Sequence, residues 1–195
     1  MNAGRRNPIS KAELREMALA RRSALGEPER AGAKEAVVAV LREMIRPGEA
    51  VSLFWPIRDE IDPRPLFQQI LQVGGTVLLP AVVGREIEFR RYDANAELEP
   101  GSFGTFHPPA EAGRGNPDLI IAPLAAFDRQ GNRIGYGGGF YDRAAKRLDD
   151  AGHRFRYVGI AFACQEVEAV PAEPYDRRLD GVVTETGLIT FTERR

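Results

Sequence analysis

Apolar side chains recur at helical spacing in the first 46 residues. Ser10, with Glu13 three residues later, has the spacing of a capping box and predicts the start of a helix. The apolar positions that follow form one stripe: Leu14, Met17, Ala18 and Leu25. Gly26 and Pro28 interrupt that stripe, so a second helix is predicted over about residues 28–46. Its inward positions are Val37, Val40, Leu41 and Met44.

After residue 48 the pattern changes to short apolar runs, which are typical of strands. We predict strands at 50–55, 76–79, 87–92, 118–122, 157–162, 181–184 and 188–191, and helices at about 62–71 and 140–151. The run at 118–122 is strongly apolar and is expected at the centre of a sheet. Pro80 is expected to end its strand, and the segment 97–116, rich in proline and glycine, is expected to form a long surface loop.

Strands that alternate with helices and are almost continuously apolar predict an α/β fold. We expect an open three-layer α/β/α arrangement with a mostly parallel sheet, preceded by the N-terminal helical pair. Residues 1–9 are expected to be a flexible tail, and residues 10–195 a single domain, because a chain of 195 residues can bury one substantial core.

Composition excludes several classes of function. The formal net charge of −1 gives no overall attraction to nucleic acid or to an anionic membrane. Residues 1–46 nevertheless hold ten Lys and Arg against six Asp and Glu, which is either a solvated helix face or an anion site. Cys164 is the only cysteine, and no apolar run approaches the length of a membrane span. We therefore expect a cytoplasmic protein, and a monomer by default.

The glycine-rich segment Arg133–Arg143 is the most informative part of the chain. Four of the five residues 135–139 are glycine, and backbone of this kind can turn consecutive amide groups toward phosphate oxygens. A helix expected from about Gly139 would direct its positive end to the same place. The alternative is a glycine-rich hairpin or linker, which the flanking aromatic residues Tyr136, Phe140 and Tyr141 argue against. The spacing fits neither a Walker loop nor a dinucleotide-binding loop.

Two basic residues of the first predicted helix share one face. Lys11 and Arg15 are four residues apart, and Lys11 lies in the first turn, where a cation opposes the helix dipole. The pair can supply two positive charges to a polyphosphate; the alternative is an ordinary surface lysine.

Carboxylates and one tryptophan supply the remaining candidates. Glu60 follows the first strand, where it can bind an amino-heterocycle while Trp55 stacks on it; the alternative for Glu60 is a solvated loop charge. Asp62 is more readily the N-cap of the next helix. Asp142 and Asp176 are candidate Mg²⁺ ligands, although Asp142 can instead stabilise its own helix and Asp176 can cap the last strands. No zinc spacing or hydrolase nucleophile is visible.

With these residues identified, the chain closely resembles the 5-formyltetrahydrofolate cyclo-ligase family, also called 5,10-methenyltetrahydrofolate synthetase. The resemblance runs in order along nearly the whole chain, through Lys11 and Arg15, Asp59–Ile61, Asp118–Pro123, Phe127–Asp142, Gly159–Phe162, Gln165, Pro171, Asp176, Asp180 and Val183–Glu185. The segment from Arg133 to Asp142 is its most specific part. The family has Tyr in many members where this chain has Phe140, so any hydrogen bond from that position is lost.

The resemblance implies an enzyme that converts 5-formyltetrahydrofolate to 5,10-methenyltetrahydrofolate with ATP and Mg²⁺, on a fold similar to sugar-phosphate isomerases and CoA transferases. It implies catalytic roles for Arg133 and Lys11, and Mg²⁺ ligation by Asp142 and Asp176. The residues implied to contact ATP are Lys11, Arg15, Arg133, Ile134, Gly135, Tyr136, Gly137, Gly138, Gly139, Phe140 and Tyr141. Those implied to line the folate side are Trp55, Glu60, Tyr136, Gly137, Gly138, Gly139 and Phe140.

Two mutational expectations and two rival functions follow. Arg133→Ala is expected to lower kcat far more than it destabilises the fold, and Glu60→Gln to weaken folate binding while sparing ATP. The rivals are a related enzyme of the sugar-phosphate isomerase or CoA transferase type, and a diverged paralogue that binds nucleotide or folate without cyclo-ligase activity.

Overall fold

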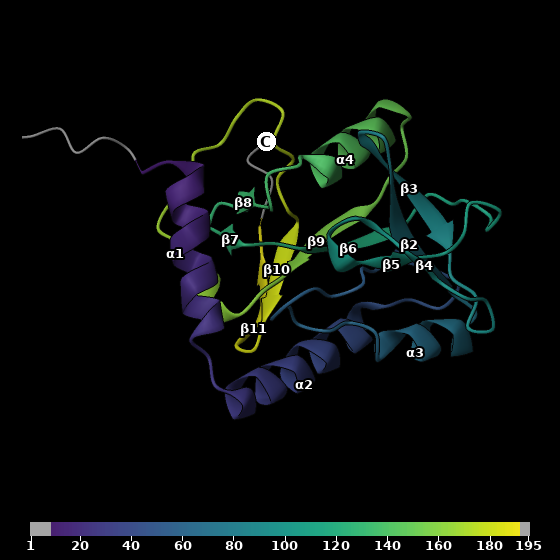
Figure 1. The fold of residues 1–195 in the computed structure, drawn as a ribbon, viewed down its shortest axis with the longest axis horizontal. Helices are drawn as coiled ribbons and strands as arrows, with labels where there is room; N and C mark the ends of the chain where they lie inside the picture. The colour runs from purple at the N-terminus through teal and green to yellow at the C-terminus, as the bar shows by residue number, and fades with distance from the viewer. Residues whose placement is uncertain (1–8, 192–195) are drawn as a thin grey trace, which may run out of the picture.

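The computed structural model describes residues 9–191, and its centre is one seven-stranded sheet (Figure 1). The strand order is β11-β10-β9-β6-β1-β2-β3. Five neighbouring strands are parallel, and the edge strands β11 and β3 are antiparallel. Their bounds are β1 Ala50–Ser52, β2 Thr76–Val83, β3 Glu86–Arg91, β6 Leu119–Pro123, β9 Arg156–Ile160, β10 Gly181–Thr184 and β11 Gly187–Thr190. The strongly apolar β6 lies at the middle of the sheet, as predicted.

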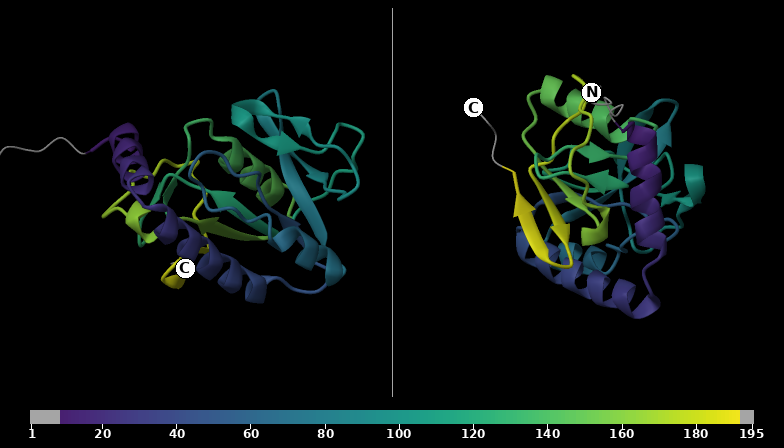
Figure 2. Two further views of the ribbon diagram at one scale, coloured as in Figure 1. Left: turned by 60° about the horizontal axis from the view of Figure 1, so that its bottom comes forward. Right: turned by 90° about the vertical axis from the view of Figure 1, so that its left-hand side faces the viewer.

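Helices cover both faces of the sheet (Figure 2). They are α1 Lys11–Ser23, α2 Glu27–Met44, α3 Leu66–Gln72 and α4 Phe140–Asp150. On one face, Val37 and Leu41 of α2 and Ile70 of α3 join the core cluster of Val51. On the other face, Ala145 and Leu148 of α4 pack against residues of β6 and β9. The predicted three-layer α/β/α fold with a mostly parallel sheet is therefore confirmed.

Helix α1 belongs to neither layer but lies across the end of the sheet (Figure 2, right). Its buried Leu14 and Ala18 pack against residues that come after the carboxyl ends of β6 and β9, among them Ala126 and Val167. The predicted capping box is confirmed, because Ser10 and Glu13 exchange both hydrogen bonds. Met17, however, is 43% exposed, so its predicted place in the apolar stripe is wrong.

A short hairpin connects β6 to α4 and was not predicted. It consists of β7 Ala126–Phe127 and β8 Arg133–Ile134. The buried carboxylate of Asp128 holds it, accepting hydrogen bonds from three backbone N–H groups and from one side-chain amide, those of Gln130 N, Asn132 N, Val170 N and Asn132 Nδ2. This turn fixes where the glycine-rich segment starts.

Three further boundaries differ from the prediction. The strand predicted at 50–55 ends at Ser52. Strand β2 continues through Pro80 to Val83. Leu78 O accepts from Leu53 N, so alternate residues of β2 face β1. Because β1 has ended before it reaches Pro80, the missing N–H of this proline costs no hydrogen bond.

Helix α3 starts at Leu66 rather than Asp62, so Asp62 is not its N-cap. The Asp62 carboxylate instead accepts the backbone N–H and the guanidinium of Arg64. The predicted loop 97–116 contains a small two-stranded ribbon, β4 Glu99–Pro100 and β5 Phe106–His107, with the 3-10 turn η1 Ser102–Gly104 between its strands. Of the predicted tail, residues 1–8 lie outside the described residues and Ile9 is 51% exposed. Within residues 9–191, no helix is both long and apolar enough to cross a membrane.

Candidate active site

The glycine-rich segment leaves β8 and reaches α4 as an exposed backbone loop. Residues 136–139 are exposed, and α4 begins at Phe140 as expected. Gly137 has φ +99° and Gly139, the N-cap, has φ +62°, conformations that other residues adopt only with strain. A Cβ at Gly138 would overlap the Phe140 ring. The loop therefore presents bare backbone beside the positive end of α4, which suits an anion.

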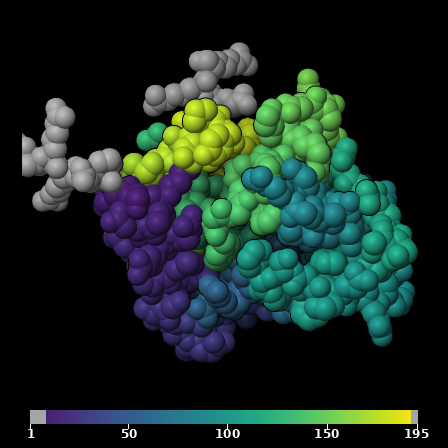
Figure 3. All heavy atoms as spheres, turned by 45° about the horizontal axis from the view of Figure 1, so that its top comes forward, coloured from purple at the N-terminus to yellow at the C-terminus, as the bar shows by residue number. Residues whose placement is uncertain are grey.

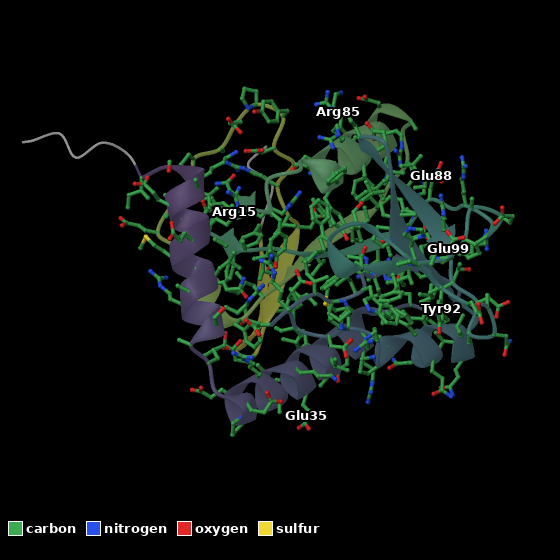
Figure 4. All side chains as sticks on the ribbon, in the orientation of Figure 1. Arg15, Glu35, Arg85, Glu88, Tyr92 and Glu99 are labelled. Carbon is green, nitrogen blue, oxygen red and sulfur yellow. The ribbon has the colours of Figure 1, made fainter. Side chains whose placement is uncertain are left out.

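The two basic residues of α1 reach this segment and the loop before β10. Arg15 extends from α1 toward the rest of the fold (Figure 4), and its Nε donates to Gly135 O at 2.8 Å. The purple α1 and the green residues near 135 accordingly lie together on one face (Figure 3). Lys11 Nζ lies 2.6 Å from a carboxylate oxygen of Glu173 and 2.6 Å from one of Asp176. The prediction that Lys11 and Arg15 share a face is confirmed.

Lys11 is charged in this setting. Burial by itself lowers the pKa of Lys11, but the hydrogen bonds and charges of Asp176 and Glu173 outweigh it and raise the pKa above its ordinary value. The ammonium therefore neutralises Asp176, one of the two predicted metal ligands. A bound polyphosphate would compete with these carboxylates for the same cation.

Arg133 forms the second such pair, with Asp142. Its side chain is only 5% exposed, and Nη2 lies 2.8 Å from Asp142 Oδ1. The guanidinium also lies 5.4 Å from the ring centroid of Tyr157 and 5.9 Å from that of Tyr141. The Nε of Arg133 and both tyrosine hydroxyls are buried and have no hydrogen-bond partner among residues 9–191. Ile134 is also buried, at 2% exposed, so it can meet a ligand only through its backbone.

Glu60 is part of a hydrogen-bonded chain rather than a solvated loop charge. Tyr136 Oη donates to Glu60 Oε1 at 2.6 Å, and the backbone N–H of Ile57 donates to Oε2 at 2.8 Å. Arg22 Nη1, from the last turn of α1, donates to Tyr136 Oη at 2.9 Å. Burial raises the pKa of Glu60, and these hydrogen bonds together with the charges of Arg22 and Arg58 partly offset that rise.

Arg22 is a buried residue of this site that we did not predict. It is 3% exposed, although it occupies the last turn of a helix, where arginines are usually solvated. A sequence signal for it does exist. Lys11, Arg15, Ala18 and Arg22 follow one another at intervals of four, three and four residues, so they lie on a single stripe of α1.

Trp55 lies apart from this hydrogen-bonded chain. Its ring centroid is 5.3 Å from that of Phe106, and the guanidinium of Arg64 lies 4.6 Å over the ring. The proposed stacking on a ligand stays a prediction.

Two hollows of the described surface lie away from the glycine-rich segment. One, of about 590 Å³, lies beside β3 and is lined by residues such as Ile87 and Arg147. The other, of about 460 Å³, lies at the amino ends of β1, β6 and β9, between residues such as Arg46, Glu49 and Arg156. The glycine-rich segment lies at the opposite, carboxyl ends, where open α/β sheets bind ligands. The convergence of charge and bare backbone, rather than a hollow, therefore identifies the candidate site.

A metal ion at this site would depend on few protein ligands. The described residues contain no group of three or more His, Cys, Asp or Glu side chains that can hold one. Asp142 and Asp176 each use one carboxylate oxygen, Oδ1 and Oδ2 respectively, in the pairs described above, and within residues 9–191 the other oxygen of each accepts no hydrogen bond. Mg²⁺ commonly uses one or two carboxylates together with phosphate oxygens and water, so this donor set fits Mg²⁺ beside a bound polyphosphate.

Comparison with known proteins identifies the family of this chain. The model of the 5-formyltetrahydrofolate cyclo-ligase family matches residues 7–185. A 5-formyltetrahydrofolate cyclo-ligase of Escherichia coli is 34% identical over 141 residues, which cover 69% of this chain and 76% of the relative. One of Mycolicibacterium smegmatis is 31% identical over 189 residues, covering 91% and 95%.

Solved structures agree. The NMR structure of Aquifex aeolicus 5,10-methenyltetrahydrofolate synthetase superposes with a TM-score of 0.81 at 35% identity, covering 95% of this chain and 94% of that one. A synthetase from Mycoplasma pneumoniae, at 23% identity and a TM-score of 0.74, shares the fold. The predicted enzyme class, a ligase, is confirmed by these relatives, and the chain belongs to the 5-formyltetrahydrofolate cyclo-ligase family.

Proposed function

We propose that this protein converts 5-formyltetrahydrofolate to 5,10-methenyltetrahydrofolate, consuming ATP in the presence of Mg²⁺ and releasing ADP and phosphate. The observation that carries the proposal is the convergence of three segments. The stripe of α1, the glycine-rich segment and the loop after β1 are joined by hydrogen bonds from Arg15 to Gly135 and from Tyr136 to Glu60. These are the segments on which the family resemblance rests.

The triphosphate is proposed to bind along the bare backbone of residues 135–139 and the first turn of α4. Gly137 and Gly139 already have the positive φ that lets amide groups turn toward an anion. Lys11 and Arg15 add two charges on the same side. Lys11 would exchange its present carboxylate partners for phosphate oxygens, which are similarly hard and anionic acceptors.

The pterin is proposed to bind on the side of Glu60. The partly buried Glu60 carboxylate, when ionised, is a strong acceptor for the amino and ring N–H groups of such a heterocycle. Tyr136 has a hydroxyl that already contacts Glu60, and the residue is 38% exposed, which leaves its ring available for stacking. Trp55 is a second candidate platform.

Asp142 and Asp176 would hold Mg²⁺ together with phosphate oxygens, each through the oxygen that accepts no hydrogen bond. Bound there, Mg²⁺ would offset the negative charge of the phosphates. Arg133 and Lys11, which now pair with these carboxylates, offset the same charge by direct interaction.

The proposed chemistry needs no enzyme nucleophile, and none was found in the sequence. The formyl oxygen of the substrate attacks the γ-phosphorus of ATP, and ADP leaves. N10 then attacks the activated formyl carbon and loses its proton, and the C–O bond breaks to release phosphate. The protein has to orient two substrates and stabilise charge on the transferred phosphoryl group.

The decisive experiment follows the absorbance of the methenyl product with purified protein and 5-formyltetrahydrofolate, with and without ATP and Mg²⁺. Product that requires both supports the proposal, and ADP should appear in equal amount. Lys11→Met should abolish most turnover, whereas Lys146→Met, a lysine on the exposed face of α4, should not. Binding of either substrate without turnover would indicate a diverged paralogue, and ATP-independent chemistry would indicate a related isomerase or transferase.

A further inference from the structure

Arg22 is the buried cation of the site for which neither the sequence nor the proposed chemistry has a role. It comes from the last turn of α1, and its side chain reaches Tyr136 on the glycine-rich segment. Its Nη1 supplies the only hydrogen bond that Tyr136 Oη accepts from residues 9–191. Among residues 9–191 the buried Nε of Arg22 has no hydrogen-bond partner, so this guanidinium gains little from its burial other than the contact with Tyr136.

The direction of this chain of hydrogen bonds follows from the chemistry of arginine. A guanidinium donates and never accepts, so Tyr136 Oη must be the acceptor in the contact with Arg22. The single phenolic proton then remains for Glu60, 2.6 Å away. Since the N–H of Ile57 donates to the other oxygen, both carboxylate oxygens of Glu60 are acceptors. These donors favour the ionised carboxylate and fix its orientation.

We propose that Arg22 is a positioning residue for the folate side of the site, acting through Tyr136 to keep Glu60 oriented as an ionised acceptor for the pterin. This inference rests on the proposed function, because it assigns Glu60 to the folate. Arg22 itself is not proposed to touch either substrate.

A pH readout separates positioning from simple structural support. The charged and titratable groups facing Glu60 are Arg22 from α1, Tyr136 from the glycine-rich segment, Arg58 from its own loop and Tyr141 from α4. Burial raises the pKa of Glu60, and Arg22 is one of the groups that hold it down. Removing Arg22 should therefore move the acidic limb of kcat/KM for folate to higher pH, because Glu60 ionises less readily.

The test compares Arg22→Met, Arg22→Lys, Tyr136→Phe and the double variant with wild type. Loss of one hydrogen bond to a charged group should raise KM and Kd for 5-formyltetrahydrofolate about tenfold in Arg22→Met. KM for ATP should stay within about twofold, since the nucleotide side is unchanged. Arg22→Lys keeps the charge and should recover part of the loss. Arg21→Met is the matched control, because Arg21 is its neighbour on α1 and, within the described part of the chain, donates only to the carbonyls of Cys164 and Glu166.

The double variant tests whether Arg22 acts through Tyr136. If it does, Arg22→Met combined with Tyr136→Phe should be no worse than the more impaired single variant. Three results would each overturn the inference and leave Arg22 as a structural anchor of α1. The first is additive losses of folate affinity in the double variant, and the second is an acidic limb of kcat/KM that does not move in Arg22→Met. The third is an equal increase in KM for both substrates together with a lower Tm. A wild-type protein with no turnover would instead refute the proposed function, and with it the folate role assigned here.

Discussion

The glycine at position 138 offers the sharpest test of the loop geometry. Gly138, unlike its neighbours Gly137 and Gly139, does not have a left-handed φ. A Cβ placed there would lie 2.5 Å from Cδ2 of Phe140, a distance at which the ring has to move. The ring is partly buried against the core under α4, and the guanidinium of Arg143 lies 5.0 Å over it. Gly138→Ala therefore acts on packing rather than on backbone conformation.

The expected cost follows from that mechanism. Forcing an extra methyl group into a packed site typically lowers the free energy of unfolding by about 1–3 kcal/mol. For a chain of this size, each kcal/mol lowers Tm by about 2–4 °C. Gly137→Ala should lower the free energy of unfolding by a similar amount, about 1–2 kcal/mol, but because of its φ of +99°. A Cβ at Gly137 has nothing closer than Arg15 Nη2 at 3.8 Å.

A second substitution separates the two mechanisms. Phe140→Leu removes the ring that blocks position 138, so Gly138→Ala should cost less in that background, with a coupling of about 1 kcal/mol or more. Gly137→Ala should cost the same in either background. Urea unfolding of the two double-mutant cycles measures both couplings. Additivity of Gly138→Ala with Phe140→Leu within about 0.5 kcal/mol would show that the ring does not occupy this space.

Three further predictions concern the charged groups of the site. Lys11→Met should change the free energy of unfolding by only about 1 kcal/mol or less, because the ion pairs of Lys11 are partly exposed. It should nevertheless strongly impair ATP binding measured by calorimetry. Lys11→Arg should bind ATP better than Lys11→Met. Glu60→Gln should raise KM for the folate and spare KM for ATP. Burial raises the pKa of Glu60 in the folded protein, so the protonated Glu60 side chain stabilises the fold most at pH values below its ordinary pKa of 4.5. This stabilisation is lost as the pH rises through the raised pKa. The Tm of Glu60→Gln, which does not titrate, should therefore increase relative to that of wild type from acid to neutral pH. Asp142→Asn and Asp176→Asn should each raise the Mg²⁺ concentration needed for half-maximal turnover. The control Asp150→Asn, on the exposed side of α4, should not. If the Mg²⁺ dependence of Asp142→Asn and of Asp176→Asn were unchanged, neither carboxylate would be a metal ligand.

The parts of the fold that could be predicted are those encoded locally. The capping box of Ser10 and Glu13 lies within four residues, and the apolar run of β6 needs burial on both sides. The hairpin β7–β8 could not be predicted, because strands of two residues show no period. Its turn depends on Asp128, whose carboxylate reaches Val170 N, 42 residues away along the chain.

The site divides in the same way. The glycine-rich segment could be recognised because four glycines in five residues indicate backbone that turns sharply or approaches a ligand closely. Lys11 and Arg15 could be recognised because residues four apart lie on the same face of a helix. Arg22 lies on the same stripe of α1, but this spacing alone did not assign it to the site, since an arginine in the last turn of a helix is favoured by the helix dipole without any partner. Its burial depends on Tyr136, 114 residues later. The pairing of each proposed metal ligand with a proposed phosphate ligand likewise needed the tertiary structure.

Arg133 shows how burial changes the meaning of a mutation. From the sequence, we expected Arg133→Ala to lower kcat far more than it destabilises the fold. The structure argues against that separation, because the side chain is 5% exposed and pairs with Asp142 at 2.8 Å. Removing one partner of a fully buried ion pair typically costs about 3–5 kcal/mol, which corresponds to a fall in Tm of roughly 6–20 °C. Because Asp142 is 19% exposed, we expect a loss at the lower end of this range.

Arg15→Ala is the appropriate comparison, because it removes one hydrogen bond to Gly135 O from a half-buried side chain and should cost only about 1 kcal/mol. A low kcat in Arg133→Ala therefore cannot by itself assign Arg133 to the phosphates. That assignment requires ATP affinity measured by calorimetry on folded Arg133→Lys, which keeps the charge beside Asp142. If Arg133→Ala unfolded in urea like wild type yet bound ATP poorly, the guanidinium would have to leave Asp142 for the nucleotide, and the buried pair described here would not be its binding state.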